Sequence, residues 1–357
     1  MEKLPVWDPF TEWRHADIRW IKVDISKEDM QRFTRKSNVK GLIQTFSFLL
    51  IICATAFLSY YAFTAHNWIL LVAGLYLHGM VYGHFGNGIH ELSHNTVFAS
   101  KFLNKAVTII FGLLYWPYNP YLYRVSHVHF HHQYTLHQNS DGEDVPNYVE
   151  LNKTVVFNLF FKALQIKSFI MCVGRLITIK PLSKNWRMRG YRLDSWERFV
   201  LERATEKERK EVYRFAAISL AFQMLFAAAC ILSGYWFLIV LVSLAPFYGP
   251  GAHGFMCGIH QHACCEANNP DFRISCGDAI LDPISSILYW RMEYHLEHHM
   301  FPAIPCYNLK KFSAFVADQL PKKEYAIPRI FKLAKLSREV FGSKEEWREN
   351  FGRFKGF

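Results

Sequence analysis

Residues 41–63 read GLIQTFSFLLIICATAFLSYYAF, a run without a single charged side chain. A helix needs about 20 apolar residues to cross the hydrocarbon core of a bilayer, so this run predicts a transmembrane helix. Three further apolar runs of comparable length follow, at residues 68–88, 215–233 and 235–253. Because only helices and closed barrels satisfy their backbone hydrogen bonds in lipid, the pattern predicts an all-α integral membrane protein with four spans in two hairpins.

Basic residues are concentrated beside the predicted spans. The chain has 357 residues and a formal net charge of +11. Under the positive-inside rule, the basic stretches place the N-terminus and the segment between the hairpins in the cytoplasm, and four spans return the C-terminus to the same side. Their position beside spans favours contact with anionic headgroups over nucleic-acid binding. The residues are Arg32, Arg35, Lys36, Lys40, Lys180, Lys184, Arg187, Arg189, Arg192 and Arg198.

The chain divides by composition into three parts. Residues 1–40 are expected to form a cytosolic N-terminal segment, residues 41–310 the membrane domain and residues 311–357 a cytosolic C-terminal segment. Within these parts, the charged stretches 181–212 and 321–357 predict cytosolic helices.

Two further apolar stretches are not expected to cross the bilayer. Residues 106–116 are too few to span, and we expect a re-entrant or interfacial helix there. Residues 154–179 are interrupted by Lys162, Lys167 and Arg175, which predicts a position in the interface.

Eight of the 17 histidines lie in three short clusters next to these apolar segments. With a cytoplasmic N-terminus and four spans, each cluster follows a return of the chain to the cytoplasmic face. The clusters are therefore predicted to meet on one side of the membrane, in a cytosolic helical cap that holds metal through imidazole. The clusters are His90 and His94; His127, His131 and His132; and His295, His298 and His299.

The spacing within the first and third clusters is helical. His90 and His94 are four residues apart, so both imidazoles lie on one helical face and can reach one ion. His295, His298 and His299 repeat the offsets of three and four.

The second cluster allows two interpretations. On a helix, His127 and His131 lie one turn apart, and His129 points roughly 200° away from His127 at about 100° per residue. On a strand, His127, His129 and His131 would instead point to one side. We favour the helix, with His129 facing away, because the other clusters have helical spacing.

The number of clustered histidines indicates more than one metal ion. A structural zinc takes four ligands and a catalytic zinc usually three, about half of what these clusters offer. Imidazole also binds iron, copper and nickel, and two redox-active ions can use O2 to attack an unactivated C–H bond. An apolar substrate would reach such a site from the bilayer.

The histidines outside the clusters have ordinary interpretations. His15, His66, His78 and His253 are expected to be interfacial or hydrogen-bonded residues, and His129 and His137 surface residues or supports for ligands. His84, six residues before His90, has no clear assignment from its position.

Two other classes of protein deserve comparison. His90-Glu91-Leu92-Ser93-His94 fits the HExxH signature of zinc proteases, in which the glutamate is the general base. An intramembrane zinc protease would leave two histidine clusters unexplained, since one zinc needs only one further ligand. A metal transporter would carry polar residues within its spans, whereas the histidines here flank the spans. Metal analysis separates these hypotheses, because two irons per chain favour an oxidase and a single zinc favours the protease.

The three clusters resemble the histidine boxes of the membrane fatty acid desaturase and hydroxylase superfamily. The resemblance covers residues 40–310. The first box, His90-Glu91-Leu92-Ser93-His94-Asn95, resembles those of desaturases and of integral-membrane alkane hydroxylases. The third box is the most specific, and the run YWRMEYHLEHHMFP at residues 289–302 is similar to a bacterial branch of desaturase-like proteins that includes proteins labelled hydrocarbon oxygenases.

The second box departs from the desaturase pattern. Many desaturases have HxxHH there, which would need a histidine at Val128, whereas HxxxHH from His127 is the spacing of alkane hydroxylases. The superfamily also implies one more ligand after the fourth span. Gln261-His262 resembles the corresponding Gln-His of bacterial desaturases, so His262 is expected to be the ninth ligand, with His260 as its competitor.

The resemblance implies a non-haem centre of two iron ions that uses O2 to oxidise a C–H bond of a fatty acyl or other lipid-like chain. Desaturation is the expected outcome. Hydroxylation of an alkyl chain, or oxidative decarboxylation of a free fatty acid to a terminal alkene, is the alternative outcome of the same centre. Four acids are candidates to accept imidazole N–H groups, or are solvated or helix-capping acids. They are Glu91, Asp141, Asp144 and Glu297.

Electrons must come from outside the chain. The sequence has no flavin or dinucleotide fingerprint and no CxxC pair for rubredoxin-type iron. A separate ferredoxin, rubredoxin or cytochrome is therefore the expected partner, and the basic segment from Lys180 to Arg214 is a candidate docking surface for an acidic carrier.

Overall fold

The computed structural model describes residues 15–162 and 195–351, and the side chains of 195–198 are not described. Helices, turns and three isolated β-bridges make up these residues, which confirms the all-α prediction for the described part of the chain. The chain divides into two compact units. Among the described residues, unit 1 comprises 15–36, 125–155 and 255–351, and unit 2 comprises 37–124, 156–162 and 195–254.

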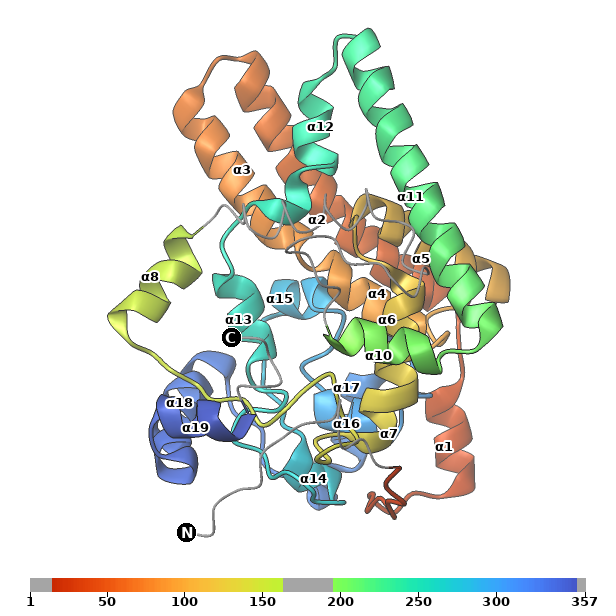
Figure 1. The fold of residues 1–357 in the computed structure, drawn as a ribbon, viewed down its shortest axis with the longest axis vertical. Coiled ribbons are helices and arrows are strands. Elements are labelled where there is room, and N and C mark those ends of the chain that lie inside the picture. Colours follow the sequence, from red (N-terminus) through yellow and green to blue (C-terminus); the bar gives the residue numbers. More distant parts are fainter. Residues whose placement is uncertain (1–14, 163–194, 352–357) are drawn as a thin grey trace. The chain divides into compact units, whose positions relative to one another are not determined.

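Unit 2 contains the helices of membrane-spanning length. Helix α2 (Asn38–Thr64) forms a hairpin with α3 (Trp68–Tyr82), which continues into α4 (Phe85–Ser93) (Figure 1). The third long helix is α11 (Glu206–Leu232). These three segments, Asn38–Thr64, Trp68–Ser93 and Glu206–Leu232, are long and apolar enough to cross a membrane. They confirm the predicted helices at 41–63, 68–88 and 215–233.

The hairpin of α2 and α3 depends on close backbone contact. A Cβ atom at Gly74 would lie 2.9 Å from the hydroxyl and 3.2 Å from the Cα of Ser59, so only glycine lets the two helices approach this far. Further along α2, the buried ring of Phe48 packs edge-on against Phe85 with 5.0 Å between centroids. The ring of Phe111 lies 4.9 Å from Phe85 and joins α5 (Lys101–Leu114) to the same core.

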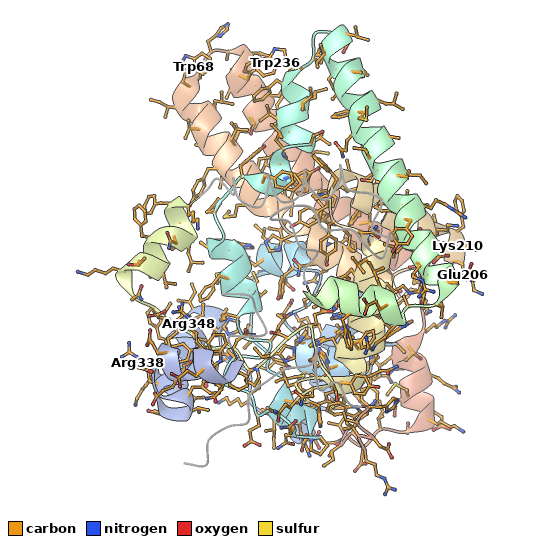
Figure 2. All side chains as sticks on the ribbon, viewed as in Figure 1. Trp68, Glu206, Lys210, Trp236, Arg338 and Arg348 are labelled. Atoms are coloured by element: carbon orange, nitrogen blue, oxygen red, sulfur yellow. The ribbon has the colours of Figure 1, made fainter. Side chains whose placement is uncertain are left out.

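Exposed tryptophans and charges mark opposite ends of unit 2. Trp68 and Trp236 stand near the tips of the hairpins (Figure 2), where tryptophan is enriched at membrane interfaces. Glu206 and Lys210 pair at the other end of α11, with 2.6 Å between carboxylate and ammonium. Both charged side chains are exposed, whereas the 18-residue apolar window of α11 is only 22% buried within the protein and suits contact with lipid.

The predicted fourth span at residues 235–253 is not one continuous helix, and the four-span topology stays a prediction. The segment is broken into α12 (Phe237–Val242), the short 3-10 helix η2 (Ala245–Phe247) and the beginning of α13 (Ala252–Gly258). Pro246 and Pro250 lack the N–H groups that a helix needs, and Gly249 has a φ of 108°, which a helix cannot accommodate. Hydropathy alone did not register these interruptions, so the described residues provide three candidate spans rather than four.

The shorter predicted helices of unit 2 are partly described. Residues 106–116 fall within and just after α5. The stretch 154–179 begins in α8 (Lys153–Phe161), and its remainder from residue 163 lies outside the described residues. Of the predicted helix at 181–212, residues 181–194 lie outside the described part, while α10 (Ser195–Arg203) and the start of α11 are helical. Residues 180–194 of the basic segment proposed from the sequence as a docking surface therefore lie outside the described residues.

Unit 1 is built from short helices around a core of aromatic and histidine side chains. In chain order they are α1 (Lys27–Thr34), a π-helix η1 (His127–His131), α7 (His132–Tyr134), α14 (Phe272–Ser275), α15 (Pro283–Leu288), α16 (His295–Met300), α17 (Cys306–Phe315), η3 (Ala317–Gln319), α18 (Ala326–Phe341) and α19 (Lys344–Phe351). Helices α18 and α19 confirm the helical prediction for 321–357 within the described residues. The last residues of α6 (Pro120–Ser126) lead into η1.

Helix α1, near the start of the described residues, packs against α17 in unit 1. The ring of Phe33 on α1 packs edge-on against Phe312 of α17, with 5.3 Å between centroids. The Asn308 amide of α17 donates to the carbonyl of Phe33 at 2.8 Å and terminates α1. The described part of the N-terminal segment therefore packs onto helices that follow the third histidine cluster.

Candidate metal centre

The second histidine cluster forms a π-helix, in which the backbone N–H of His132 bonds to the carbonyl of His127 five residues earlier. In a straight α-helix, residues five apart point roughly 140° apart, at about 100° per residue. The wider π turn brings them together, and the Nε2 atoms of His127 and His132 lie 3.0 Å apart. The helical interpretation is confirmed, but the sequence did not predict its π form. His129 is exposed, as expected for a residue that faces away from His127.

Seven of the nine predicted ligands lie together in unit 1, in two groups. His131, His262, His295 and His299 offer ligand atoms that all lie within 4.8 Å of one another, and the same limit holds among His127, His132 and His298. The second and third clusters are thus each divided between the two groups. Along α16, His295 and His299 point to the same side, one turn apart, and His298 points to the neighbouring side.

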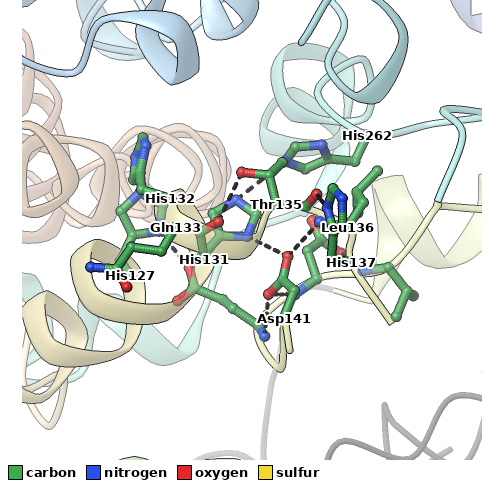
Figure 3. Close-up of polar contacts among 12 residues, drawn as sticks. His127, His131, His132, Gln133, Thr135, Leu136, His137, Asp141 and His262 are labelled. Carbon is green, nitrogen blue, oxygen red and sulfur yellow. Dashed lines mark hydrogen bonds and ion pairs between the residues drawn. The ribbon is translucent and has the colours of Figure 1, made fainter. Parts of the chain in front are cut away.

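Hydrogen bonds orient three of the four rings in the first group. His131 Nδ1 lies 2.9 Å from the buried Asp141 carboxylate (Figure 3), and His262 Nδ1 lies 3.0 Å from the carbonyl of Ser275. Neither acceptor has a proton to give, so both rings carry their proton on Nδ1. His299 Nδ1 lies 3.0 Å from the hydroxyl oxygen of Thr135. That hydroxyl donates its own proton to the carbonyl of His131 at 2.8 Å. His299 must therefore donate from Nδ1 as well.

The Nε2 atoms of these rings are consequently lone pairs that face one another. His262 Nε2 lies 3.3 Å from His131 Nε2 and 3.0 Å from His295 Nε2. A metal ion among these nitrogens could bind each of them through its lone pair, so the donor set fits a metal ion. Neutral imidazole nitrogen, held from behind by a carboxylate or carbonyl, is the usual form of a histidine ligand.

The pKa values in this group have the same physical cause. Burial lowers the pKa of His262 to about 4, and burial together with neighbouring imidazoles lowers the pKa of His295 and His299 well below the ordinary value for histidine. Three of the rings are therefore neutral and able to ligate. Burial also lowers the pKa of His131, but the Asp141 carboxylate overcomes this and raises it to about 9. Asp141 thus favours positive charge at this ring, which a metal ion supplies as well as a proton does.

The second group has a carboxylate that sequence reasoning missed. Glu143 accepts from His127 Nδ1 at 2.6 Å and from the hydroxyl of Ser126 at 2.6 Å. Asp144, one of the candidate acids from the sequence, accepts from the backbone N–H of Val145 at 2.9 Å. Asp141, Glu143 and Asp144 follow the second box closely. This group of acids was the feature of the sequence that indicated a carboxylate partner for the histidines of the box. Only the fold of the loop decides which carboxylate reaches the ring.

The first histidine cluster lies in unit 2, at the end of α4. The rings of His90 and His94 are 5.2 Å apart between centroids, as their spacing of four residues predicts. Glu91 is fully buried, and its carboxylate lies 3.1 Å from His90 Nδ1. Glu91 is thus one of the candidate acids, and the structure places it against an imidazole rather than in solvent.

The third cluster is supported by a buried charge network. Lys323 Nζ lies 2.6 Å from Glu297 and also pairs with Asp278. Asp278 accepts in turn from the backbone N–H of Leu296 at 2.8 Å, in the first turn of α16. Burial lowers the pKa of Lys323, but the two carboxylates overcome this and raise it, so the ammonium stays charged. Glu297 therefore contacts this lysine and not an imidazole, and Lys323 and Asp278 are supports that the sequence did not reveal.

The remaining histidines lie outside the two groups. His260 Nε2 lies 2.9 Å from the carbonyl of Met256 in the preceding turn, and the neighbouring His262 is the one that joins the first group. His84 Nε2 lies 2.7 Å from His253 Nδ1 in unit 2. His78 lies between the carbonyl of Leu241 at 2.8 Å and the hydroxyl of Thr55 at 2.9 Å, as expected for a hydrogen-bonded interior histidine.

Apolar helices of membrane-spanning length and buried groups of histidines able to hold metal define a class of protein, the membrane oxidoreductases with histidine boxes. Residues 66–330 match the model of the fatty acid desaturase family, and the chain belongs to that family. It is similar to a sphingolipid delta(4)-desaturase DES1-like protein of Arabidopsis thaliana, with 27% identity over 248 residues. That match covers 67% of this chain and 62% of the plant protein, so the chain spans less than two thirds of its relative's length.

Proposed function

We propose that the protein uses two iron ions and O2 to desaturate a fatty acyl or sphingolipid-like chain. The observation that carries the proposal is the group of buried rings of His131, His262 and His299, each held through Nδ1 so that its Nε2 is free to bind a metal ion. The family and the plant relative support lipid oxidation, and the relative's name supports desaturation. Membership of the desaturase family also argues against the zinc protease that the HExxH signature suggests.

The proposed ligand set has nine histidines. His131, His262, His295 and His299 form one set of donors, and His127, His132 and His298 belong to a second. We propose that the first box adds His90 and His94, on the strength of its HxxxH spacing. Nine imidazoles exceed what one zinc needs and suit two ions of four or five ligands each.

When bound, the irons supply the activation of O2 and the removal of hydrogen from the lipid chain. The protein's residues hold each ring in one tautomer, through Asp141, Glu143, Thr135 and the carbonyl of Ser275. This orientation matters because small errors in placement at a reacting carbon cost large factors in rate. The apolar helices of unit 2 allow a lipid chain to approach from the bilayer without passing through water.

The reaction also needs a source of electrons outside the chain. Oxygen leaves as water only after it receives electrons from both the lipid and an external donor, and a ferredoxin, rubredoxin or cytochrome is the proposed donor.

We also propose that both termini and the histidine groups face the cytoplasm, on the basis of the basic residues beside the first span. Cysteines introduced near either terminus should then react with impermeant thiol reagents only after the membrane is opened.

Product analysis tests the reaction. The purified protein, loaded with iron and supplied with a reductase system, is given fatty acids, fatty acyl esters, sphingoid lipids and alkanes of several lengths, and the products are identified by mass spectrometry. A product lighter by one pair of hydrogens supports desaturation. A product with one added oxygen, or a terminal alkene one carbon shorter, favours hydroxylation or decarboxylation instead. Absence of any oxidised lipid, with iron bound, contradicts the proposal.

A further inference from the structure

We propose that the outer face of α18 is the docking surface for a small acidic one-electron carrier protein. The inference rests on the proposed function, because it names the place where that reaction receives its electrons. It concerns unit 1 alone and residues that the structure describes.

Large apolar side chains are exposed along this face. Ile327 is 60% exposed and Phe331 is 65% exposed, and they lie one turn apart on α18. Tyr325, which precedes the helix, is 68% exposed. A group of exposed apolar and aromatic side chains with a polar border is typical of a protein interface, because burying them there stabilises the complex.

The border of this apolar group is basic. Arg338 projects outward from α18 (Figure 2), and Lys335 and Lys332 lie on the same helix. Two acids in residues 322–341 form ion pairs with this border, Glu324 with Lys332 at 2.7 Å and Glu339 with Lys335 at 3.7 Å. They are too few to neutralise the basic residues of the segment. Residues 322–341 hold six basic residues and two acids, and only Lys323 is engaged by buried carboxylates. The surplus of positive charge selects an acidic partner and accelerates its approach.

The inner face of the same helix leads directly to a proposed metal ligand. Leu333 and Ile330 pack in one buried cluster with Ala263 and Val149. The hydroxyl of Ser337 lies 3.1 Å from the thiol sulfur of Cys264, two residues after His262. An electron delivered to the outer face therefore has only the thickness of one helix and a short covalent step before it reaches His262. This short route favours a redox carrier over other partners for the patch.

The electron balance is simple. The reduced carrier, an iron–sulfur or haem protein, loses one electron and the iron centre gains it, while no bond forms or breaks in the carrier. Reduced carriers must bind one after another to supply the electrons that the lipid does not. The complex of carrier and enzyme must therefore dissociate readily. A patch of modest size with exposed charges suits such transient binding.

Binding of a carrier, which needs no turnover, provides the main test. The probes are an acidic plant-type [2Fe–2S] ferredoxin and an acidic cytochrome, each titrated against the full iron-loaded chain in detergent at low and high salt. In the test variant, Phe331→Ser is combined with Arg338→Glu. In the matched control, Phe315→Ser is combined with Lys311→Glu on α17, where the phenylalanine is 45% exposed and the lysine is exposed.

We expect at least one carrier to bind the unaltered chain, more weakly at high salt, and the α18 variant to raise its Kd about tenfold or more. The control should bind as the unaltered chain does. Iron content and melting temperature, measured in all samples, show whether a variant is folded.

Three outcomes overturn the inference. They are unchanged carrier binding by a folded α18 variant, no binding of either carrier to the unaltered chain, and an equal loss of binding in the control. Loss of self-association, or of binding to anionic vesicles, in the α18 variant without loss of carrier binding would assign the face to another occupant. If carrier binding depends on α18 but no lipid is oxidised, the docking surface stands and the proposed lipid reaction fails.

Discussion

His262 Nε2 lies 3.3 Å from His131 Nε2, although the two residues are 131 positions apart in the chain. Each ring gives its Nδ1 proton to a fixed acceptor, the carboxylate of Asp141 for His131 and the carbonyl of Ser275 for His262. The two facing Nε2 atoms can therefore both give an electron pair to one metal ion. A cation bound between the two Nε2 atoms would stabilise their contact.

Removal of metal should destabilise unit 1. A ligand that binds only the folded state at 100 times its Kd adds about 2.7 kcal/mol of stability, and chelation removes this contribution along with the screening of the facing lone pairs. We expect a lower melting temperature after treatment with a strong chelator, and recovery on addition of ferrous iron. Metal analysis of the untreated protein should find two irons per chain, whereas a single zinc would contradict the proposed centre.

Substitution of His298 should abolish activity, and substitution of His129 should not. His298 is fully buried among the other cluster rings, and its truncation removes a proposed ligand. His129 is exposed on the other side of the same π-helix that carries His127. We expect His298→Ala to lower bound iron and turnover together, with His129→Ala as the matched control. Full iron content and activity in His298→Ala would rule out this ligand assignment.

Glu143 is predicted to position His127. Its carboxylate lies 2.6 Å from His127 Nδ1, and partners of this kind change metal affinity by about 10–100-fold when they are lost. We expect Glu143→Gln to weaken iron binding within that range, because an amide is a poorer acceptor than a carboxylate. Asp144→Asn is the control, since its oxygen still accepts from Val145. Iron titration of the two proteins measures the difference, and equal affinities would argue against the role of Glu143.

Loss of the Lys323 ammonium should be costly. Without it, Asp278 and Glu297 remain buried next to α16 with no cation to pair with, and breaking a buried ion pair in this way costs about 3–5 kcal/mol. We expect Lys323→Met to lower the free energy of unfolding by that order and to reduce iron content. Lys323→Arg should recover part of both, because it restores the charge. The exposed Lys322→Met serves as the control, and a loss of stability equal to that of Lys323→Met would refute the specific role of the network.

Much of the fold was predictable from local patterns. Three of the four predicted spans are single apolar runs whose length alone requires a helix in lipid, and they are present. The fourth run, at 235–253, has similar hydropathy but is broken around Pro246 and Gly249, because hydropathy averages over the backbone properties of individual residues. The helical spacing of the histidine boxes likewise placed His90 with His94, yet it did not predict a π-helix in the second box.

The sequence by itself determined the chemistry of this protein. Apolar runs of sufficient length make a membrane protein, and three histidine boxes with helical spacing provide more imidazoles than one metal ion needs. The tertiary structure decided how those imidazoles are shared and held. The separation of His131 from His127, the contact of His262 with both distant boxes in unit 1, and the choice of Glu143 over Asp144 arise from contacts between remote segments. Local periodicity carries no information on these contacts, because they depend on how loops close and which side chains are buried together.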